Sequence, residues 1–230
     1  MNTQRQMLLD LKSEQVPTLE NFVAGANAEL VARLHTMANA NCFELLYLWG
    51  SASCGKSHLL AATAAAAEAQ RPVLYLNAEK VGAGVTAASG SLLVIDDVQR
   101  LDADAQIALF RMFNSARFLG LALLLSGDAP PLQLALREDL RTRVGQMLIY
   151  EIKTLSDEEK AAALEQHAIL RGMLLDAGVV QYLLRHGRRD LPSLIGMLNS
   201  LDCASLEQHR PPTVPLLREL MQTNLNIDAP

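Results

Sequence analysis

The feature that constrains the fold most is a short apolar run that leads directly into a loop of small residues. Leu45 to Trp49 has the length and composition of a buried strand, and Gly50 ends it. The loop that follows reads GSASCGKS and matches the phosphate-binding pattern G-x-x-x-x-G-K-[ST]. An alanine-rich stretch, AATAAAAEAQ, then has the composition of a helix. This strand–loop–helix context predicts an α/β nucleotide-binding domain.

The residue types in this loop suit the binding of a nucleoside polyphosphate. Small residues let backbone N–H groups turn toward phosphate oxygens, and the N-terminus of the following helix favours negative charge. Lys56 is predicted to contact the terminal phosphates, and Ser57 to offer a hydroxyl group to Mg²⁺. The residues predicted to bind nucleotide here are Gly50, Ser51, Ala52, Ser53, Cys54, Gly55, Lys56, Ser57 and His58. The alternative is a glycine-serine turn that holds nothing.

A second apolar run ends in two carboxylates. Leu92 to Asp97 reads LLVIDD, the pattern of a buried parallel strand with acids at its carboxyl end. Open α/β sheets bind their ligands at this edge. Asp96 is predicted to hold Mg²⁺, mostly through water, and Asp97 to orient an attacking water. A solvated turn at the end of the strand is the alternative, and the phosphate loop upstream favours the functional interpretation.

The apolar runs before residue 154 form a set of five strands. Besides LLVIDD, strands are predicted at about Phe43–Trp49, at VLYLN after Pro72, at LALLL before Ser126, and at Met147–Ile152. Helices are predicted at 28–39, with Asn27 as the N-cap, and at 103–118. Residues 82–91 contain little that can pack and are predicted to form a loop.

From Thr154 onward the pattern is helical only. Ser156 and Glu159 form a capping box at the start of the first of these helices. This helix is predicted to end near Arg171, and further helices are predicted at about 176–186, 191–207 and 214–224. The chain of 230 residues is therefore predicted to be α/β, with three parts: a flexible arm (1–18), a five-stranded parallel P-loop domain (19–153) and a small all-helical domain (154–230).

Charge and cysteine content restrict the classes of function. The formal net charge is −5, which argues against broad, sequence-independent binding to DNA. The three cysteines match neither a disulfide framework nor a zinc pattern. The polar start of the chain, with Asp10, does not resemble a signal peptide, and no apolar run is long enough to span a bilayer. We expect a soluble cytoplasmic protein.

Two further motifs each have two interpretations. In the arm, Gln6, Met7, Leu8, Leu9 and Leu11 form a peptide that can dock in an apolar groove, or simply a frayed terminus. The segment LREDLRTRVG brings together Arg137, Arg141 and Arg143, the first two of which lie one helical turn apart. A surface salt bridge is the more common use of any one such arginine.

Taken in order, these pieces resemble the AAA+ family, and within it the DnaA branch. The segments that carry the resemblance are LENFVAGANAEL, the phosphate loop running into GKSHLL, LLVIDDVQ, SGDAPP and LRTRVG. The likeness covers about 19–225. A short AAA+ unit with a glutamine-leucine peptide at its start is similar to the Hda family, the regulatory inactivators of DnaA. The S-D-E-E-K sequence and Arg171-Gly172 are also similar to that family.

The resemblance implies a role for each matching position. Phe22 and Val23 would lie near the adenine base, Asp96 and Asp97 would be the Walker B acids, and Ser57 with Asp96 would hold Mg²⁺ beside ADP or ATP. Asp128 falls in the sensor 1 position. Arg143 corresponds to the arginine finger, which reaches a nucleotide on a neighbouring subunit. Gln6, Met7, Leu8, Leu9 and Leu11 would bind the DNA polymerase sliding clamp.

The implied function is negative regulation of replication initiation, by promoting hydrolysis of DnaA-bound ATP while the clamp supplies the contact with DNA. Pro192 departs from the DnaA pattern, because it stands where the helical lid usually presents a sensor arginine. Since a proline cannot contact a phosphate, we expect weak or no intrinsic hydrolysis. The resemblance leaves the oligomeric state open, including a homo-oligomer, and also the preference between ADP and ATP.

Two alternatives stay open at this level. One is an AAA+ ATPase that loads a helicase or acts on a transposase, which would hydrolyse ATP appreciably without the Gln6 peptide. The other is an adaptor whose nucleotide only stabilises the fold, so that Lys56→Ala would lower the melting temperature and Arg143→Ala would do nothing.

Overall fold

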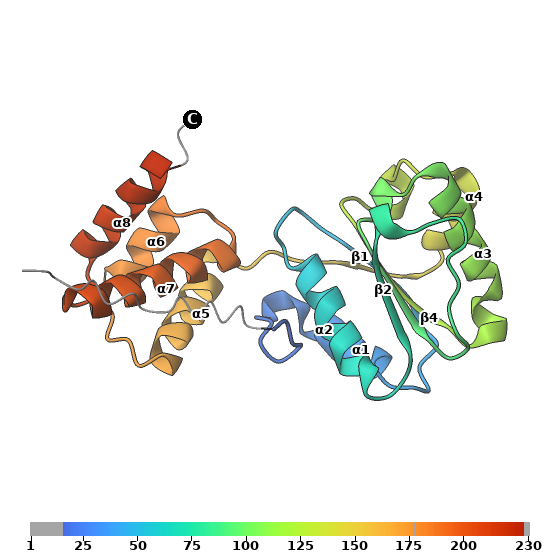
Figure 1. Ribbon diagram of the computed structural model, residues 1–230, viewed down its shortest axis with the longest axis horizontal. Helices are drawn as coiled ribbons and strands as arrows, with labels where there is room; N and C mark the ends of the chain where they lie inside the picture. Colours follow the sequence, from blue (N-terminus) through green and yellow to red (C-terminus); the bar gives the residue numbers. More distant parts are fainter. Residues whose placement is uncertain (1–15, 177, 228–230) are drawn as a thin grey trace, which may run out of the picture.

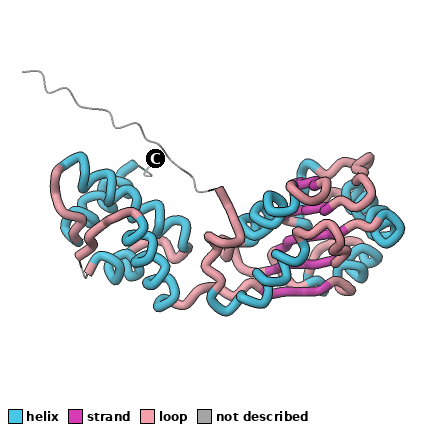
Figure 2. Tube along the Cα trace, turned by 90° about the horizontal axis from the view of Figure 1, so that it is seen from below, coloured by secondary structure: helices cyan, strands magenta, loops and turns pink. Residues whose placement is uncertain are grey.

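The computed structural model describes residues 16–176 and 178–227, and shows a sheet covered by helices on both faces beside a separate group of helices (Figure 1). The predicted clamp-binding residues and all but the last three residues of the predicted arm lie outside these described ranges. The tube view shows the same division, with all the strands in one part and only helices in the other (Figure 2).

Five strands form one sheet in the order β2-β3-β4-β1-β5, and every adjacent pair is parallel. The strands are β1 (Leu45–Trp49), β2 (Val73–Asn77), β3 (Leu92–Asp96), β4 (Ala122–Gly127) and β5 (Leu148–Glu151). The predicted five-stranded parallel sheet is confirmed. Because all strands run the same way, their carboxyl ends share one edge, and this is where the predicted site residues Gly50 and Asp96 lie.

The predicted first strand began two residues too early. Phe43 is 56% exposed. The guanidinium carbon of Arg71 lies over its ring, 5.9 Å from the centroid of the Phe43 ring. Phe43 also packs against Gly120, so it belongs to the connection that precedes β1. The predicted fifth strand was too long by one residue at each end, since β5 covers only Leu148–Glu151.

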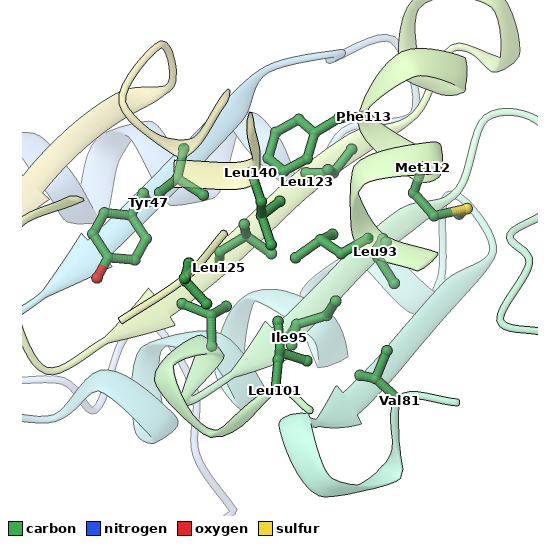
Figure 3. Packing of buried hydrophobic residues seen from close by; sticks show 14 of the residues in the cluster. Tyr47, Val81, Leu93, Ile95, Leu101, Met112, Phe113, Leu123, Leu125 and Leu140 are labelled. Carbon is green, nitrogen blue, oxygen red and sulfur yellow. The ribbon is translucent and has the colours of Figure 1, made fainter. Parts of the chain in front are cut away.

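Helices cover both faces of the sheet, α1 and α2 on one side and α3 and α4 on the other (Figure 1). Their bounds are α1 (Ala28–Met37), α2 (Lys56–Glu68), α3 (Ala103–Leu119) and α4 (Glu138–Val144). Alternate residues of the strands face each layer, as their period of two requires. Figure 3 shows the α3/α4 layer, where Leu93, Ile95, Leu123 and Leu125 meet Phe113 and Leu140.

Asn27 does not cap α1, contrary to the prediction. Its side chain is 4% exposed and bonds instead to the backbone of Lys153, donating to the carbonyl at 2.9 Å and accepting from the N–H at 2.8 Å. Nearby, a Cβ added at Gly25 would lie 2.7 Å from Leu155 Cδ2 and 2.8 Å from Glu159 Oε1. The segment before α1 is thus attached to the connection that leads into the helical domain.

The helical domain contains α5 (Asp157–Leu170), α6 (Val179–His186), α7 (Leu191–Gln208) and α8 (Val214–Ile227). The capping box of Ser156 and Glu159 is present in both directions, as predicted. Leu164, Leu183, Leu198 and Leu216 lie at the centre of its own apolar core and are fully buried. Within the described residues, no helix is both long and apolar enough to cross a membrane.

Candidate nucleotide-binding site

The phosphate loop lies where β1 ends and α2 begins, and its backbone needs conformations that few side chains tolerate. Gly55 has φ +101° immediately before α2, and Ser53 has φ +59°. A Cβ at Gly50 would meet Cys54 Sγ at 2.8 Å and the Ile152 carbonyl oxygen at 3.2 Å. The first glycine is therefore required by close contact, and the second by its dihedral angle.

The chemistry of the loop suits an anion. The first turn of α2 carries no acidic residue, and the first N–H groups of any α-helix lack partners within the helix. These N–H groups and the helix dipole attract negative charge. The loop residues Ser51, Ala52 and Ser53 and the helix residue Ser57 are exposed. A phosphate can therefore reach both the backbone of the loop and the Ser57 hydroxyl.

Lys56 is drawn into the loop by backbone carbonyls. Its Nζ donates to the carbonyl oxygens of Gly50 and Ser51, both at 2.9 Å. Cys54 lies beside it, with Sγ 4.0 Å from Nζ. Burial raises the pKa of the Cys54 thiol, and the Lys56 charge opposes that rise. The result is a fixed positive charge inside the loop beside a neutral thiol.

Phe22 and His58 connect the segment before α1 to the loop. A Cβ at Gly55 would lie 2.7 Å from Phe22 Cε2, so the aromatic ring rests directly on this glycine. The rings of Phe22 and His58 are 5.7 Å apart, and His58 Nε2 lies 3.0 Å from the Thr18 carbonyl oxygen. Phe22 and Val23 are both half-buried. Phe22 is thus brought next to the phosphate loop.

Asp96 ends β3 at the same edge of the sheet and is only 6% exposed. Its Oδ1 accepts a short hydrogen bond from Ser126 Oγ on β4, and Ser126 accepts one from the Asp97 N–H at 3.0 Å. The sequence prediction missed Ser126. A hydroxyl group at the end of the leucine run LALLL was the available signal, because a buried strand places a polar residue only where it has a partner.

A second hydroxyl group lies near the same acids. Tyr75 on β2 is 36% exposed. Partial burial raises the pKa of Tyr75 to about 12, and the carboxylates of Asp96 and Asp97 add to that rise. The phenol therefore stays neutral and can donate a hydrogen bond toward the acids.

The two acids of the pair are placed differently. Asp97 has φ +58° and begins the 3-10 turn Val98–Arg100, a conformation that asparagine and aspartate tolerate better than most residues. Its carboxylate accepts from Gln99 Nε2 at 3.1 Å and lies 3.7 Å from Arg100 Nε. The predicted water-orienting acid is thus half-buried and has partners within its own turn.

Asp128, the predicted sensor residue, is exposed in the turn that follows β4. A hydrogen bond holds this turn to β1, because Tyr47 Oη donates to the Ala129 carbonyl oxygen at 2.6 Å. A Cβ at Gly127 would overlap the same Oη, so a larger residue there would displace the Tyr47 hydroxyl group. Burial raises the pKa of Tyr47, and the Asp128 charge contributes.

The residues present fit a magnesium ion held beside a nucleotide. Among the described residues, no cluster of three or more His, Cys, Asp or Glu side chains could hold a metal alone. Mg²⁺ in phosphate sites is usually held by one or two carboxylates together with water and phosphate oxygens. Asp96 would supply the carboxylate and Ser57 the hydroxyl group. The donor set therefore suits Mg²⁺ that arrives with a nucleotide.

Arg143 lies in the last turn of α4 and is exposed. Its guanidinium donates to Asn114 Oδ1 on α3 at 3.1 Å and lies 6.0 Å from the ring centroid of Phe110. Arg137, by contrast, forms an ion pair with Asp139 at 2.9 Å, which is the common surface use of an arginine. Within the described part of the chain, Arg143 has no ion pair.

In the helical domain, Pro192 is at the start of α7, where a missing N–H costs nothing. It is exposed, and Arg188 and Arg189 before it are exposed as well. Arg188 lies 3.8 Å from Asp190, whose side chain caps α7. The start of this helix is therefore well formed without an arginine on its first turn.

The parallel sheet with its phosphate loop, the acid at the end of β3 and the helical domain that follows together define an AAA+ P-loop fold. Residues 13–89 match the family model of the bacterial DnaA ATPase domain, and residues 157–221 match that of the Hda lid domain. The chain is an Hda/DnaA-related AAA+ protein.

Solved structures show the same fold. Domain III of DnaA from Thermotoga maritima is 20% identical with a TM-score of 0.73, over 91% of this chain and 97% of that one. A DnaA bound to AMPPCP and single-stranded DNA is 23% identical with a TM-score of 0.69, over 81% of this chain. The match spans 64% of that DnaA chain. A point mutant of RuvB from Thermotoga maritima is 17% identical with a TM-score of 0.72, over 92% of this chain and 74% of that one.

Proposed function

We propose that this protein is a cytoplasmic negative regulator of replication initiation that promotes hydrolysis of ATP bound to DnaA. In this proposal the chain holds ADP or ATP with Mg²⁺ in its own phosphate loop. It binds the sliding clamp through Gln6–Leu11 and places Arg143 against the nucleotide of DnaA. The matches to the DnaA ATPase domain and to the Hda lid support the choice of partner.

The observation that carries the proposal is the exposure of Arg143. A guanidinium that serves a nucleotide on another subunit must lie on the surface and must not be neutralised by a carboxylate of its own chain. Arg143 meets both conditions, since it is exposed and, among the described residues, forms no ion pair, while its guanidinium bonds to a neutral amide and lies near an aromatic ring. An arginine supplied in trans stabilises the charge of the phosphoryl-transfer transition state, an effect of about 10³- to 10⁵-fold.

The protein's own turnover is proposed to be weak or absent. Two features support this. Pro192 occupies the first turn of α7, where DnaA-type proteins are expected to present an arginine to the γ-phosphate. Asp97, the acid predicted to orient an attacking water, has partners in its own turn. A nucleotide held by the phosphate loop would then set the conformation of the protein rather than be consumed.

Contact with DNA is proposed to be indirect. The net charge of −5 disfavours binding to the phosphate backbone, and the clamp supplies an alternative connection. The residues proposed to bind the clamp lie outside the described ranges, so this part of the proposal rests on the Gln6–Leu11 sequence. Clamp and DnaA are the two proposed partners, and gel filtration of the same mixtures reports whether the chain also associates with itself.

The experiment is a hydrolysis assay with ATP-loaded DnaA, sliding clamp loaded on DNA, and the purified chain. We expect the wild-type chain to accelerate loss of DnaA-bound ATP, and Arg143→Ala to reduce that acceleration by at least about 10³-fold. Arg137→Ala is the matched control, because it removes a nearby arginine that is already paired with Asp139. Unchanged hydrolysis with Arg143→Ala, while clamp binding persists, would refute the proposed role.

A further inference from the structure

The end of β4 contributes a buried hydroxyl group to the predicted magnesium site. Ser126 is fully buried, and Asp96, whose Oδ1 accepts from its Oγ, is 6% exposed. The Asp97 N–H donates to the same Oγ at 3.0 Å. Because the serine oxygen accepts from this N–H, the serine proton is left to point at the carboxylate. The hydroxyl group is thus held in one orientation.

The position of this pair in the sheet places it on the side of the phosphate loop. Ser126 pairs in register with Leu48 of β1, two residues before Gly50. Leu48 faces the layer that contains Leu59 and Leu60 of α2, the helix that begins at Lys56. Residues paired across parallel strands share a face of the sheet. The Ser126 side chain therefore lies on the face that α2 covers, and it joins the acid of β3 to the strand next to the loop.

We propose that Ser126 is a positioning residue for Mg²⁺, which orients the Asp96 carboxylate so that it can accept the ion of a magnesium–nucleotide complex. The proposal rests on the proposed nucleotide binding at this site and adds a residue to it. Carboxylates that bind metals are themselves commonly hydrogen-bonded, and loss of such a partner typically weakens metal affinity about 10- to 100-fold. In Ser126→Ala, Asp96 would lose the bond that fixes its rotamer.

This role separates the contribution of Mg²⁺ from that of the phosphate loop. The loop holds phosphate through its backbone and Lys56, which is not among the hydrogen-bond partners of Ser126. Removing the hydroxyl group should therefore weaken nucleotide binding that depends on Mg²⁺. Nucleotide binding without Mg²⁺ should stay unchanged. A residue that only supported the fold would weaken both kinds of binding together.

The test is a titration of Mg²⁺ into the full chain with a fluorescent ADP analogue, followed by the same binding measurement in EDTA. For Ser126→Ala we expect the Mg²⁺ concentration for half-maximal binding to rise about tenfold, with affinity in EDTA within about twofold of wild type. Ser126→Thr keeps the hydroxyl group and should restore the wild-type value. Ser91→Ala, which truncates another buried serine at the opposite end of β3, should leave both values unchanged.

Two results would overturn the proposal. One is an unchanged Mg²⁺ requirement in a folded Ser126→Ala, checked by its thermal melting curve. The other is an equal loss in Mg²⁺ and in EDTA that Ser126→Thr does not restore, which marks a purely structural residue. If the wild-type chain bound no ADP analogue under either condition, the proposed function itself would fail, and this outcome is distinct from both.

Discussion

The phosphate loop and the surface around Arg143 use their charged residues in opposite ways. In the loop, Lys56 bonds to carbonyl oxygens of its own chain, and Asp96 at the end of β3 bonds to a buried serine. On α4, Arg143 is exposed and contacts the Asn114 amide and the face of Phe110. The charges proposed to serve a ligand inside the subunit are fixed by hydrogen bonds within the loop and the sheet, whereas the charge proposed to serve another subunit is loosely held.

The proposed function requires one fold to bind one nucleotide and to act on another, and this difference suits both tasks. Low exposure around Asp96 strengthens its interactions and limits its rotamers. The exposed Arg143 guanidinium has one hydrogen bond, to the Asn114 amide oxygen. It is therefore held weakly enough to be released when a phosphate oxygen offers a better acceptor. The two regions should therefore respond independently to mutation.

The largest effect on the loop is expected from Lys56→Ala. Loss of a charge-assisted hydrogen bond of about 1.5–3 kcal/mol corresponds to a decrease of about 10- to 100-fold in nucleotide affinity. Isothermal titration with Mg²⁺–ADP measures it. Binding of the clamp should be unaffected, because the proposed contact lies in residues 6–11. An affinity for ADP equal to that of wild type would remove Lys56 from the site.

Gly55→Ala is expected to destabilise the fold at the loop. Alanine is strained at φ +101°, and its Cβ would lie 2.7 Å from Phe22 Cε2. Overpacking and backbone strain together suggest a loss of about 1–3 kcal/mol in the free energy of unfolding, measured by urea denaturation. Gly84→Ala is the control, since a Cβ there meets nothing within 4 Å. Equal stability of the two variants would mean that Phe22 does not rest on the loop.

Asn114→Ala should have the smallest effect and should be confined to the arginine surface. The hydrogen bond between Arg143 and the Asn114 side-chain amide is exposed. Exposed interactions of a charged group contribute about 1 kcal/mol or less to stability. Because this hydrogen bond must break before Arg143 can reach another nucleotide, we expect stimulation of DnaA-bound ATP hydrolysis to change by no more than about fivefold, with ADP affinity unchanged. If ADP affinity fell as well, the phosphate loop and the surface around Arg143 would be coupled. The claim that they act independently would then be wrong.

The sequence was sufficient to predict what local patterns determine. The phosphate loop, the strand ending in Asp96 and the capping box of Ser156 each depend on residues close together in the chain. Their elements appear where predicted, and the strand bounds differ by no more than one or two residues at each end. The five-strand set and its change to helices at about residue 154 followed from apolar runs of strand length and helical spacing.

What the sequence did not show depends on distant contacts. Asn27 was predicted to cap α1 because asparagine before a helix usually does so, but Lys153 offers two backbone bonds that local patterns do not report. Ser126 and Asp96 are 30 residues apart and meet only because β3 and β4 are adjacent. Likewise, nothing in the sequence shows that Tyr47 supports the turn at Ala129, 82 residues away.

The most direct test measures both regions in one protein preparation. Arg143→Ala is assayed for its own affinity for Mg²⁺–ADP and for its effect on single-turnover hydrolysis of ATP preloaded on DnaA, with clamp on DNA present. We predict an ADP affinity within about twofold of wild type and a loss of stimulated hydrolysis of at least about 10³-fold. Loss of ADP binding in the variant, or stimulation equal to that of wild type, would contradict the separation of the two regions.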